Sequence, residues 1–186
     1  MDSNLDYKSD DFADVRKLYE EQATIIDTVP AWIFYKNKEN TFIRVNKTFC
    51  EAMGKSREEL EGKSLFDIYP KEQAEAFWTD DKEVIESGAA RKNIIEQVDI
   101  PSGRRWVQTS KMPYRDDKGE VIGVIGFAID ITEQKQAEEM TVRSHQMLQK
   151  IIDLLPTRIF WKDLNLNYLG CNQTFAQDAG KKSASS

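Results

Sequence analysis

The chain has few of the side chains that most often carry catalysis. Its 186 residues include one histidine, His145, and two cysteines, Cys50 and Cys171, neither of which stands in a metal-type spacing. A Ser-His-Asp or Cys-His arrangement has no support with this single histidine, and there is no glycine-rich phosphate loop. The acidic residues stand in turns and helix caps, which gives paired-carboxylate catalysis no specific support. The sequence therefore predicts that the chain is not an enzyme.

Long apolar runs and an excess of positive charge are also missing. No apolar segment approaches the roughly 20 residues that span a bilayer, and the polar, acidic N-terminus does not read as a signal peptide. The net charge of −6 argues against nucleic-acid binding, because phosphate contacts need clustered Lys and Arg side chains. Two isolated cysteines are typical of a reducing compartment. We therefore expect a cytoplasmic chain with no nucleic-acid partner and no membrane segment.

What the sequence does contain is an internal repeat. Several short motifs return after a constant offset of 126 residues: Ile25-Ile26-Asp27, Pro30, Ile33-Phe34, Lys36, Asn46, Thr48-Phe49 and Gly54-Lys55. A fixed offset without gaps means that one supersecondary unit is used twice. The second copy stops about thirty residues in, so the pattern indicates one module followed by the beginning of its twin. We expect the effector of the parent protein to lie outside this sequence.

Hydrophobic periodicity predicts an α+β domain. The expected elements are, in order, an amphipathic helix at 10–29, strands at 31–36 and 41–45, short helices after Asn46 and Ser56, a longer helix at 70–88, and strands at 91–100, 104–112 and 120–131. The division expected from these patterns is a tail and helix at 1–22, the main domain at 23–133, a linker helix at 134–155, and a truncated second domain at 156–186.

The linker helix has a weak heptad pattern. Its seam steps alternately by three and four residues through Ala137, Met140, Ser144, Met147, Ile151 and Leu154. This pattern suits a coiled coil, and it suits a surface helix packed on its own domain equally well. Both readings remain open at this stage.

The ordered set of motifs resembles a PAS domain with its C-terminal PAC portion. The segments that carry the resemblance are Asn46-Lys47-Thr48-Phe49, Ser56 to Lys63, Arg105-Trp106-Val107, Pro113 to Glu120, Gly123-Val124-Ile125-Gly126 and Asp130-Ile131-Thr132-Glu133. The resemblance implies a five-stranded antiparallel sheet of order 2-1-5-4-3, with short helices over one face, a cavity between them, and amphipathic helices on both sides. Residues 148–181 resemble the opening strands and first helix of the same family.

The resemblance also implies a function. Such domains are sensory or regulatory modules of multidomain signalling proteins, such as histidine kinases of two-component systems and cyclic-dinucleotide enzymes. They bind a small ligand or a partner, and they relay the signal through flanking helices and dimerisation. The alternative is a ligand-free structural spacer that only mediates dimerisation and helix-to-helix relay.

Two cofactor classes of this family are argued against. In the LOV-type flavin class a cysteine follows the Gly62-Lys63 position by two residues, and here that residue is Leu65. Cys50 lies one helix too early to replace it. Haem members use an axial histidine on the long helix, whereas His145 stands in the linker. The cofactor therefore remains unknown.

The resemblance assigns a set of residues to the cavity: Phe34, Lys36, Phe49, Met53, Phe66, Phe77, Trp78, Glu96, Val107, Thr109, Lys111, Val124, Gly126 and Ala128. The small side chains of the last strand are expected to leave room above the sheet. An inward ammonium needs a partner, because an unpaired buried charge is costly. Lys36 is expected to pair with Glu96 or with solvent at the sheet edge, or else Lys36 or Lys111 holds an anionic ligand.

The end of the domain is expected to carry the signal. Asp130 and Thr132 stand where the last strand meets the exit helix, where Thr132 is either a simple helix cap or part of the coupling between sheet and output. The other face of this strand is too apolar to face water. We expect the N-terminal helix, a partner subunit or both to cover it in a homodimer. The repeated hairpin at 158–171 is marginal alone, so we expect it to be held by the first domain, a neighbouring chain or a lattice contact.

Overall fold

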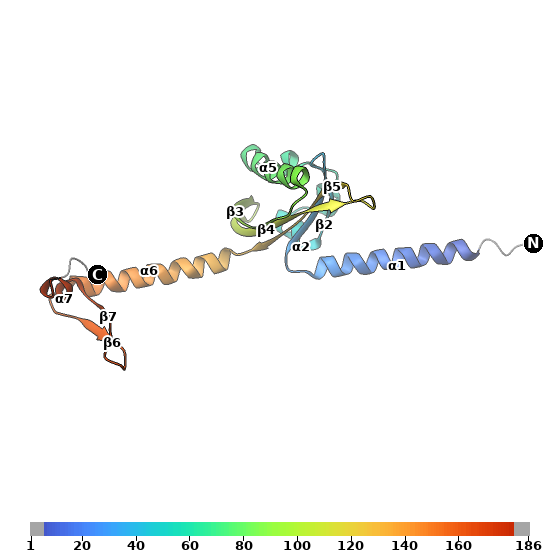
Figure 1. The fold of residues 1–186 in the computed structure, drawn as a ribbon. Coiled ribbons are helices and arrows are strands. Elements are labelled where there is room, and N and C mark those ends of the chain that lie inside the picture. The colour runs from blue at the N-terminus through green and yellow to red at the C-terminus, as the bar shows by residue number, and fades with distance from the viewer. Residues whose placement is uncertain (1–5, 181–186) are drawn as a thin grey trace, which may run out of the picture. The chain divides into compact units, whose positions relative to one another are not determined.

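The computed structural model describes residues 6–180, with side chains from Asp14 onward. Two compact units divide after Thr132 (Figure 1). The first contains α1 (Asp6–Thr28) and an α+β domain, and the second contains α6 (Thr132–Leu154) with a small hairpin and helix. No helix within residues 6–180 is both long and apolar enough to span a bilayer.

The first unit is built on one antiparallel sheet. Its strands are β1 (Trp32–Asn37), β2 (Phe42–Val45), β3 (Arg91–Ile100), β4 (Gly103–Arg115) and β5 (Val121–Asp130). Their order is β2-β1-β5-β4-β3, which confirms the order that the resemblance implied. β4 extends beyond the predicted end at Met112, because Pro113 pairs with Val124 on one side while β3 begins only opposite Lys111. A proline is tolerated where no neighbouring strand needs its missing N–H.

Four helices cover one face of this sheet. They are α2 (Lys47–Met53), α3 (Arg57–Leu60), α4 (Leu65–Ile68) and α5 (Lys71–Ser87). The Asn46 side chain accepts a hydrogen bond from the Phe49 backbone N–H at 3.0 Å, and Ser56 opens a capping box with Glu59, so both predicted caps form. Sequence periodicity did not predict α4, because a single turn is too short to show a repeat.

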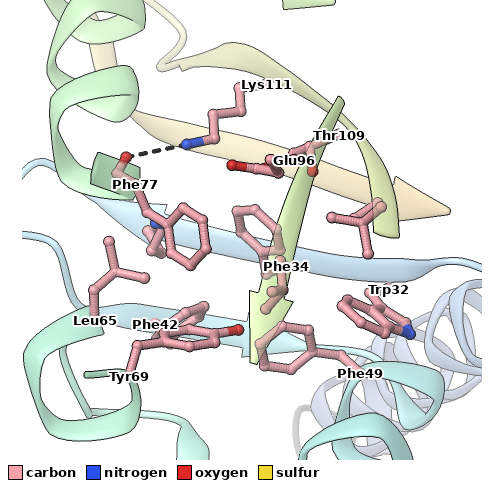
Figure 2. Close-up of a pocket in the computed structure, with 14 residues that line it drawn as sticks. Trp32, Phe34, Phe42, Phe49, Leu65, Tyr69, Phe77, Glu96, Thr109 and Lys111 are labelled. Carbon is pink, nitrogen blue, oxygen red and sulfur yellow. Dashed lines mark hydrogen bonds between the residues drawn. The ribbon is translucent and has the colours of Figure 1, made fainter. Parts of the chain in front are cut away.

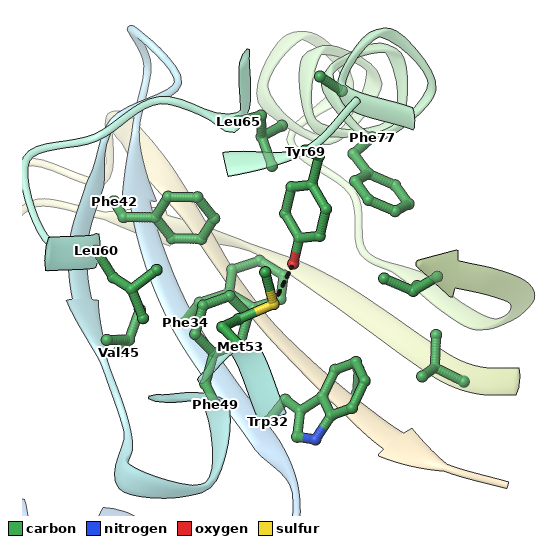
Figure 3. Packing of buried hydrophobic residues seen from close by; sticks show 14 residues of the cluster. Trp32, Phe34, Phe42, Val45, Phe49, Met53, Leu60, Leu65, Tyr69 and Phe77 are labelled. Carbon is green, nitrogen blue, oxygen red and sulfur yellow. Dashed lines mark hydrogen bonds between the residues drawn. The ribbon is translucent and has the colours of Figure 1, made fainter. Parts of the chain in front are cut away.

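The hydrophobic core lies between the sheet and these helices (Figure 3). Aromatic rings fill most of it, including a T-shaped pair of Phe34 and Phe42 at 5.9 Å and another of Tyr69 and Phe77 at 5.1 Å. The space expected above Gly126 is occupied, because a Cβ at that position would overlap the ring of Phe34. The glycine on β5 thus makes room for a core ring.

The second unit repeats the opening of the first. After α6, the strands β6 (Phe160–Lys162) and β7 (Tyr168–Cys171) form a hairpin, followed by α7 (Gln173–Asp178). The contacts that hold the hairpin come from the end of α6, where the Asn172 amide donates to the Ile152 carbonyl at 3.0 Å. The large apolar residues of the predicted seam are exposed within this unit, Leu154 at 82%.

Candidate functional site

A small cavity lies between the sheet and its helical cover (Figure 2). Its volume of about 40 Å³ is enough for a few water molecules or a ligand of a few heavy atoms. Most of the wall is aromatic or aliphatic, and one side is polar. The lining residues are Trp32, Phe34, Lys36, Phe42, Phe49, Leu65, Tyr69, Phe77, Glu96, Val98, Val107, Thr109, Lys111 and Ala128.

A buried ion cluster forms the polar side of the cavity. Lys36 comes from β1, Lys111 from β4, and the carboxylate of Asp81 reaches them from α5. The two lysines are each 2% exposed and Asp81 is 1% exposed. The Lys36 ammonium donates to Asp81 Oδ2, and Lys111 Nζ lies 3.0 Å from Asp81 Oδ1. One carboxylate of α5 therefore joins two strands of the sheet to the helix above them.

The partner of Lys36 differs from the expectation. Pairing with Glu96 or with solvent at the sheet edge is wrong, because β1 is an inner strand between β2 and β5 and its Lys36 side chain points beneath α5. There the ammonium meets Asp81 and lies over two rings, 5.1 Å from the centroid of Phe34 and 5.3 Å from that of Phe42. Charge pairing and ring contact together hold this buried cation.

Burial also shifts the ionisation of the polar wall. Desolvation lowers the pKa of Lys36 to about 8, although the negative charge of Asp81 opposes this shift, and the positive charge of Lys111 adds to it. Desolvation likewise raises the pKa of the Glu96 carboxyl, against a hydrogen bond with Thr109. Two ionisable groups with perturbed pKa values beside one cavity are typical of a functional site.

Nine of the residues assigned to the cavity from the sequence do line it: Phe34, Lys36, Phe49, Phe77, Glu96, Val107, Thr109, Lys111 and Ala128. Five others lie elsewhere. Met53 and Val124 are buried outside the lining, Gly126 lies against the Phe34 ring, Trp78 packs at the edge of the core, and Phe66 is 47% exposed. Phe66 points outward because α4 buries Leu65 instead.

Sequence reasoning missed several wall residues and the carboxylate that organises them. The missed wall residues are Trp32, Phe42, Leu65, Tyr69 and Val98. Asp81 was missed as well, although its spacing carried a signal. It falls on the three-four spacing of the buried residues Ala74, Phe77 and Val84, so an acidic residue stands in the apolar stripe of α5.

The junction between β5 and α6 has its own hydrogen bonds. The Thr132 backbone N–H donates to Asp130 Oδ1 at 2.9 Å, and the Trp106 backbone N–H donates to Thr132 Oγ1 at 2.9 Å. Thr132 is buried, whereas Asp130 is exposed. The Thr132 side chain therefore ties the start of the exit segment to β4, and Asp130 shapes the turn before it.

A groove of about 310 Å³ lies on the opposite face of the sheet, between that face and α1. The Arg44 guanidinium lies 4.9 Å from the ring centroid of Tyr19, and the rings of Tyr35 and Tyr114 meet edge-on at 4.7 Å. α1 thus contributes to covering the apolar face, while Ile129 stays 44% exposed. Part of the face is open to a further partner.

Two positions bear on the flavin and haem cofactors, Leu65 and His145. Leu65 is buried in the cavity wall, and His145 lies exposed on α6 in the second unit. Within residues 6–180, no three His, Cys, Asp or Glu side chains gather in a way that could hold a metal ion.

An antiparallel sheet of this order, roofed by short helices over a small cavity and continued into an exit helix, defines the PAS class of fold. A family profile described as "PAS fold" matches residues 26–136. The chain belongs to the PAS family.

Among curated proteins, the chain is similar to the aerobic respiration control sensor protein ArcB of Escherichia coli K12. The two are 32% identical over 127 residues, which is 65% of this chain and 16% of ArcB. An uncharacterised protein of Sinorhizobium fredii, y4lL, is 26% identical over 155 residues and is covered to 18%. The chain thus spans less than a fifth of the length of these relatives.

Solved structures show the same fold. The VqmA–ligand–DNA complex of Vibrio cholerae matches with a TM-score of 0.56 and 28% identity, over 60% of this chain and 51% of that one. The PAS domain of Bordetella pertussis BvgS matches with a TM-score of 0.52 and 22% identity, over 70% of this chain and 98% of that one.

Proposed function

We propose that the chain is a sensory module of a larger signalling protein, which binds a small ligand in the cavity beneath α5. The observation that carries this proposal is the polar wall of Lys36, Lys111 and Glu96 in an otherwise mostly apolar cavity, with both lysines paired to the buried Asp81 carboxylate. A few convergent polar groups in an apolar cavity are typical of small-molecule sites. The similarity to the sensor ArcB and to the ligand-bound VqmA supports the same function.

The route of the signal is proposed to run through β4 and the exit helix. Lys111 lies on β4 in the cavity wall, and the backbone N–H of Trp106 on the same strand donates a hydrogen bond to Thr132 Oγ1. A ligand that binds one arrangement of this wall more tightly shifts the conformational equilibrium of the β5–α6 junction towards the matching arrangement. In the full-length parent, Asp130→Ala should uncouple the output while the domain stays folded, as judged by circular dichroism. Unchanged signalling by this variant would contradict the relay.

Dimerisation and a second module complete the proposal. The exposed seam of α6 and the open part of the outer sheet face are the surfaces that we assign to a homodimer. The second unit, whose hairpin repeats the contacts of the first, is proposed to be the beginning of a second PAS domain. The catalytic effector, such as a histidine kinase, would then belong to the rest of the parent, and the location would be cytoplasmic.

We do not assign a nucleic-acid partner to this module. VqmA is described in complex with DNA, but the match covers only 51% of that chain. The net charge of −6 does not favour phosphate binding, which needs clustered Lys and Arg side chains.

A structural spacer is the second candidate, and the size of the cavity favours it. With about 40 Å³ of space and the ring of Phe34 over Gly126, the core is nearly filled. In this case the buried ion pairs serve only to fix the packing of α5 on the sheet.

Native mass spectrometry of the freshly purified chain separates the two functions. A sensor should retain a small molecule as an added mass, and Lys111→Met should lose it. A spacer should show the mass of the polypeptide alone, as a dimer. A retained mass that survives Lys111→Met would overturn the assignment of the site to this cavity wall.

A further inference from the structure

Among the fully buried side chains of the ion cluster, positive charge exceeds negative charge. Lys36 and Lys111 share a single fully buried carboxylate, that of Asp81. Two further carboxyl groups are only partly buried. Asp80 lies 3.6 Å from Lys111 and also pairs with Arg91. Glu96 lines the cavity but forms no ion pair with either lysine within 4 Å. Two buried ammonium groups with one buried counter-charge form an incompletely neutralised site, which is costly in a low-dielectric interior.

The hydrogen bonds of the cluster are incomplete as well. An ammonium carries three donors. Among the described residues, Lys111 makes one hydrogen bond, to the Phe77 carbonyl at 3.0 Å, and Lys36 makes one, to Asp81. Asp81 Oδ1 is buried 3.0 Å from Lys111 Nζ but has no hydrogen bond of good geometry. Both ammonium groups therefore keep unused hydrogen-bond donors beside the cavity. The Asp81 carboxylate lies close to Lys111 but does not form a well-oriented hydrogen bond with it.

We propose that this cluster binds a small carboxylate, which competes with the Asp81 carboxylate for Lys36 and Lys111. This inference rests on the sensory function proposed above and names its ligand class. A carboxylate accepts several charge-assisted hydrogen bonds at once, which suits two adjacent ammonium groups. The volume of about 40 Å³ limits the ligand to a few heavy atoms, and the aromatic wall around Phe34 and Phe42 receives its apolar end.

Competition with Asp81 gives this site a structural consequence. Asp81 belongs to α5, whereas both lysines belong to the sheet. When the ligand takes the lysines, α5 loses the ion pairs that hold it to β1 and β4, and the helix is free to shift. Binding is thereby coupled to the helical cover by an exchange of one carboxylate for another.

Chemical rescue tests the site on the full chain. Asp81→Ala removes the atoms of one carboxylate, so sodium formate should occupy the same place and raise the thermal midpoint of the variant by roughly 4 °C or more. The rise should be saturable, exceed that in sodium chloride of equal ionic strength, and vanish in Asp81→Ala combined with Lys111→Met. Lys162→Met, which removes an exposed lysine of the second unit, should leave the rescue of Asp81→Ala unchanged. No rescue beyond chloride would overturn the proposal.

The wild-type chain provides a second measurement that does not depend on the folding of Asp81→Ala. Saturation-transfer NMR with acetate and with its neutral counterpart acetamide should show binding of acetate only, with loss of the signal in Lys111→Met. Acetamide binding as well as acetate would overturn the carboxylate class. If acetate fails to bind while the purified chain retains a neutral molecule, the anion site is wrong and the sensory function stands. If neither acetate nor acetamide binds and the purified chain retains no small molecule, the carboxylate site and the sensory function are both wrong.

Discussion

Two segments of this chain, the β1-β2-α2 segment and the β6-β7-α7 segment, adopt the same local structure in different surroundings. Asn46 and Asn172 occupy equivalent positions, and each uses its side chain to join the hairpin to the helix before it. The amide of Asn46 donates to the Ile26 and Ala31 carbonyls at 3.1 and 2.8 Å, and that of Asn172 donates to the Ile152 and Thr157 carbonyls at 3.0 and 2.8 Å. This network needs no other part of the domain.

The two segments differ in the surroundings of one repeated lysine, which is Lys36 in the first and Lys162 in the second. Lys36 lies 5.1 Å from the Phe34 ring centroid, and Lys162 lies 5.8 Å from that of Phe160 and 4.0 Å from that of Tyr168. Lys36 is buried against Asp81, whereas Lys162 is exposed. The hairpin sequence alone thus places a lysine over aromatic rings. Lys36 is buried and paired with a carboxylate only because α5 covers the sheet. This burial and pairing make Lys36 part of the cavity site.

The largest effect on the difference between Lys36 and Lys162 is expected from removal of the Asp81 carboxylate. Asp81→Ala leaves Lys36 and Lys111 without a fully buried counter-ion, and the free energy of unfolding of the first unit should fall by about 3–5 kcal/mol. Urea unfolding followed by tryptophan fluorescence measures it. Asp178→Ala, which removes the exposed partner of Arg158 in the second unit, is the matched control and should change that value by less than about 0.5 kcal/mol. Equal effects of the two changes would contradict the account.

The repeated asparagine should show what the two segments share. Asn46→Ala removes a helix cap and leaves buried backbone groups without partners, which should cost about 3 kcal/mol in the first unit. Asn172→Ala removes the same bonds from the second hairpin, so amide hydrogen exchange should accelerate there while the first unit keeps its stability. Exchange that stays unchanged at Ile159 and Phe175 would show that Asn172 does not hold its hairpin.

Each of the two segments has an aromatic ring packed against a glycine, and substitution of that glycine compares how firmly the two rings are held. At Gly126 an added Cβ meets the ring of Phe34, which is only 9% exposed, so Gly126→Ala should cost about 1–3 kcal/mol. At Gly170 an added Cβ meets Trp161, which is 39% exposed and can swing away. Gly170→Ala should therefore cost less than about 0.5 kcal/mol. Thermal unfolding of both variants checks the difference, and a costly Gly170→Ala would mean that Trp161 is fixed.

The smallest effect is the pH dependence of stability. Folding lowers the pKa of Lys36 to about 8, so between about pH 8 and the unfolded value of 10.5 the unfolded chain binds more protons than the folded one. Stability then rises with pH across this window, by about 1 kcal/mol between pH 8 and pH 9. Denaturant titrations at several pH values should show that slope in the wild type and in Lys162→Met, and its loss in Lys36→Met. A slope that persists in Lys36→Met would assign the titration to another group.

The sequence predicted the sheet and most helices because local patterns define them. The caps at Asn46 and Ser56 and the proline and glycine at the ends of α5 mark the boundaries of the helices. The strand order followed from the resemblance to the PAS family. α4 escaped prediction because one turn has no periodicity. The end of β4 was placed too early because the unpaired side of Pro113 depends on where β3 begins.

The site was harder to predict than the fold, since its geometry depends on side chains from distant elements. The inward lysines followed from the resemblance to the PAS family, but their partner Asp81 comes from a helix and stands 45 residues beyond Lys36. The space above Gly126 could not be assigned from β5 alone, because the ring that fills it belongs to β1. The spacing within α5 did mark Asp81 as an acidic residue in an apolar stripe. An acidic residue in such a stripe is the sequence signal that predicts a buried carboxylate here.

Direct observation of the lysine ammonium groups tests the central claim that α5 locks Lys36 and Lys111 in the cavity wall. In a ¹⁵N-lysine-labelled chain at pH 6, two slowly exchanging ammonium signals should be visible by NMR, one lost in Lys36→Met and the other in Lys111→Met. Lys162 should exchange too fast with water to give a comparable signal. Two protected signals with this assignment are the result that the account predicts. Absence of both, or protection of Lys162 equal to that of Lys36, would contradict it.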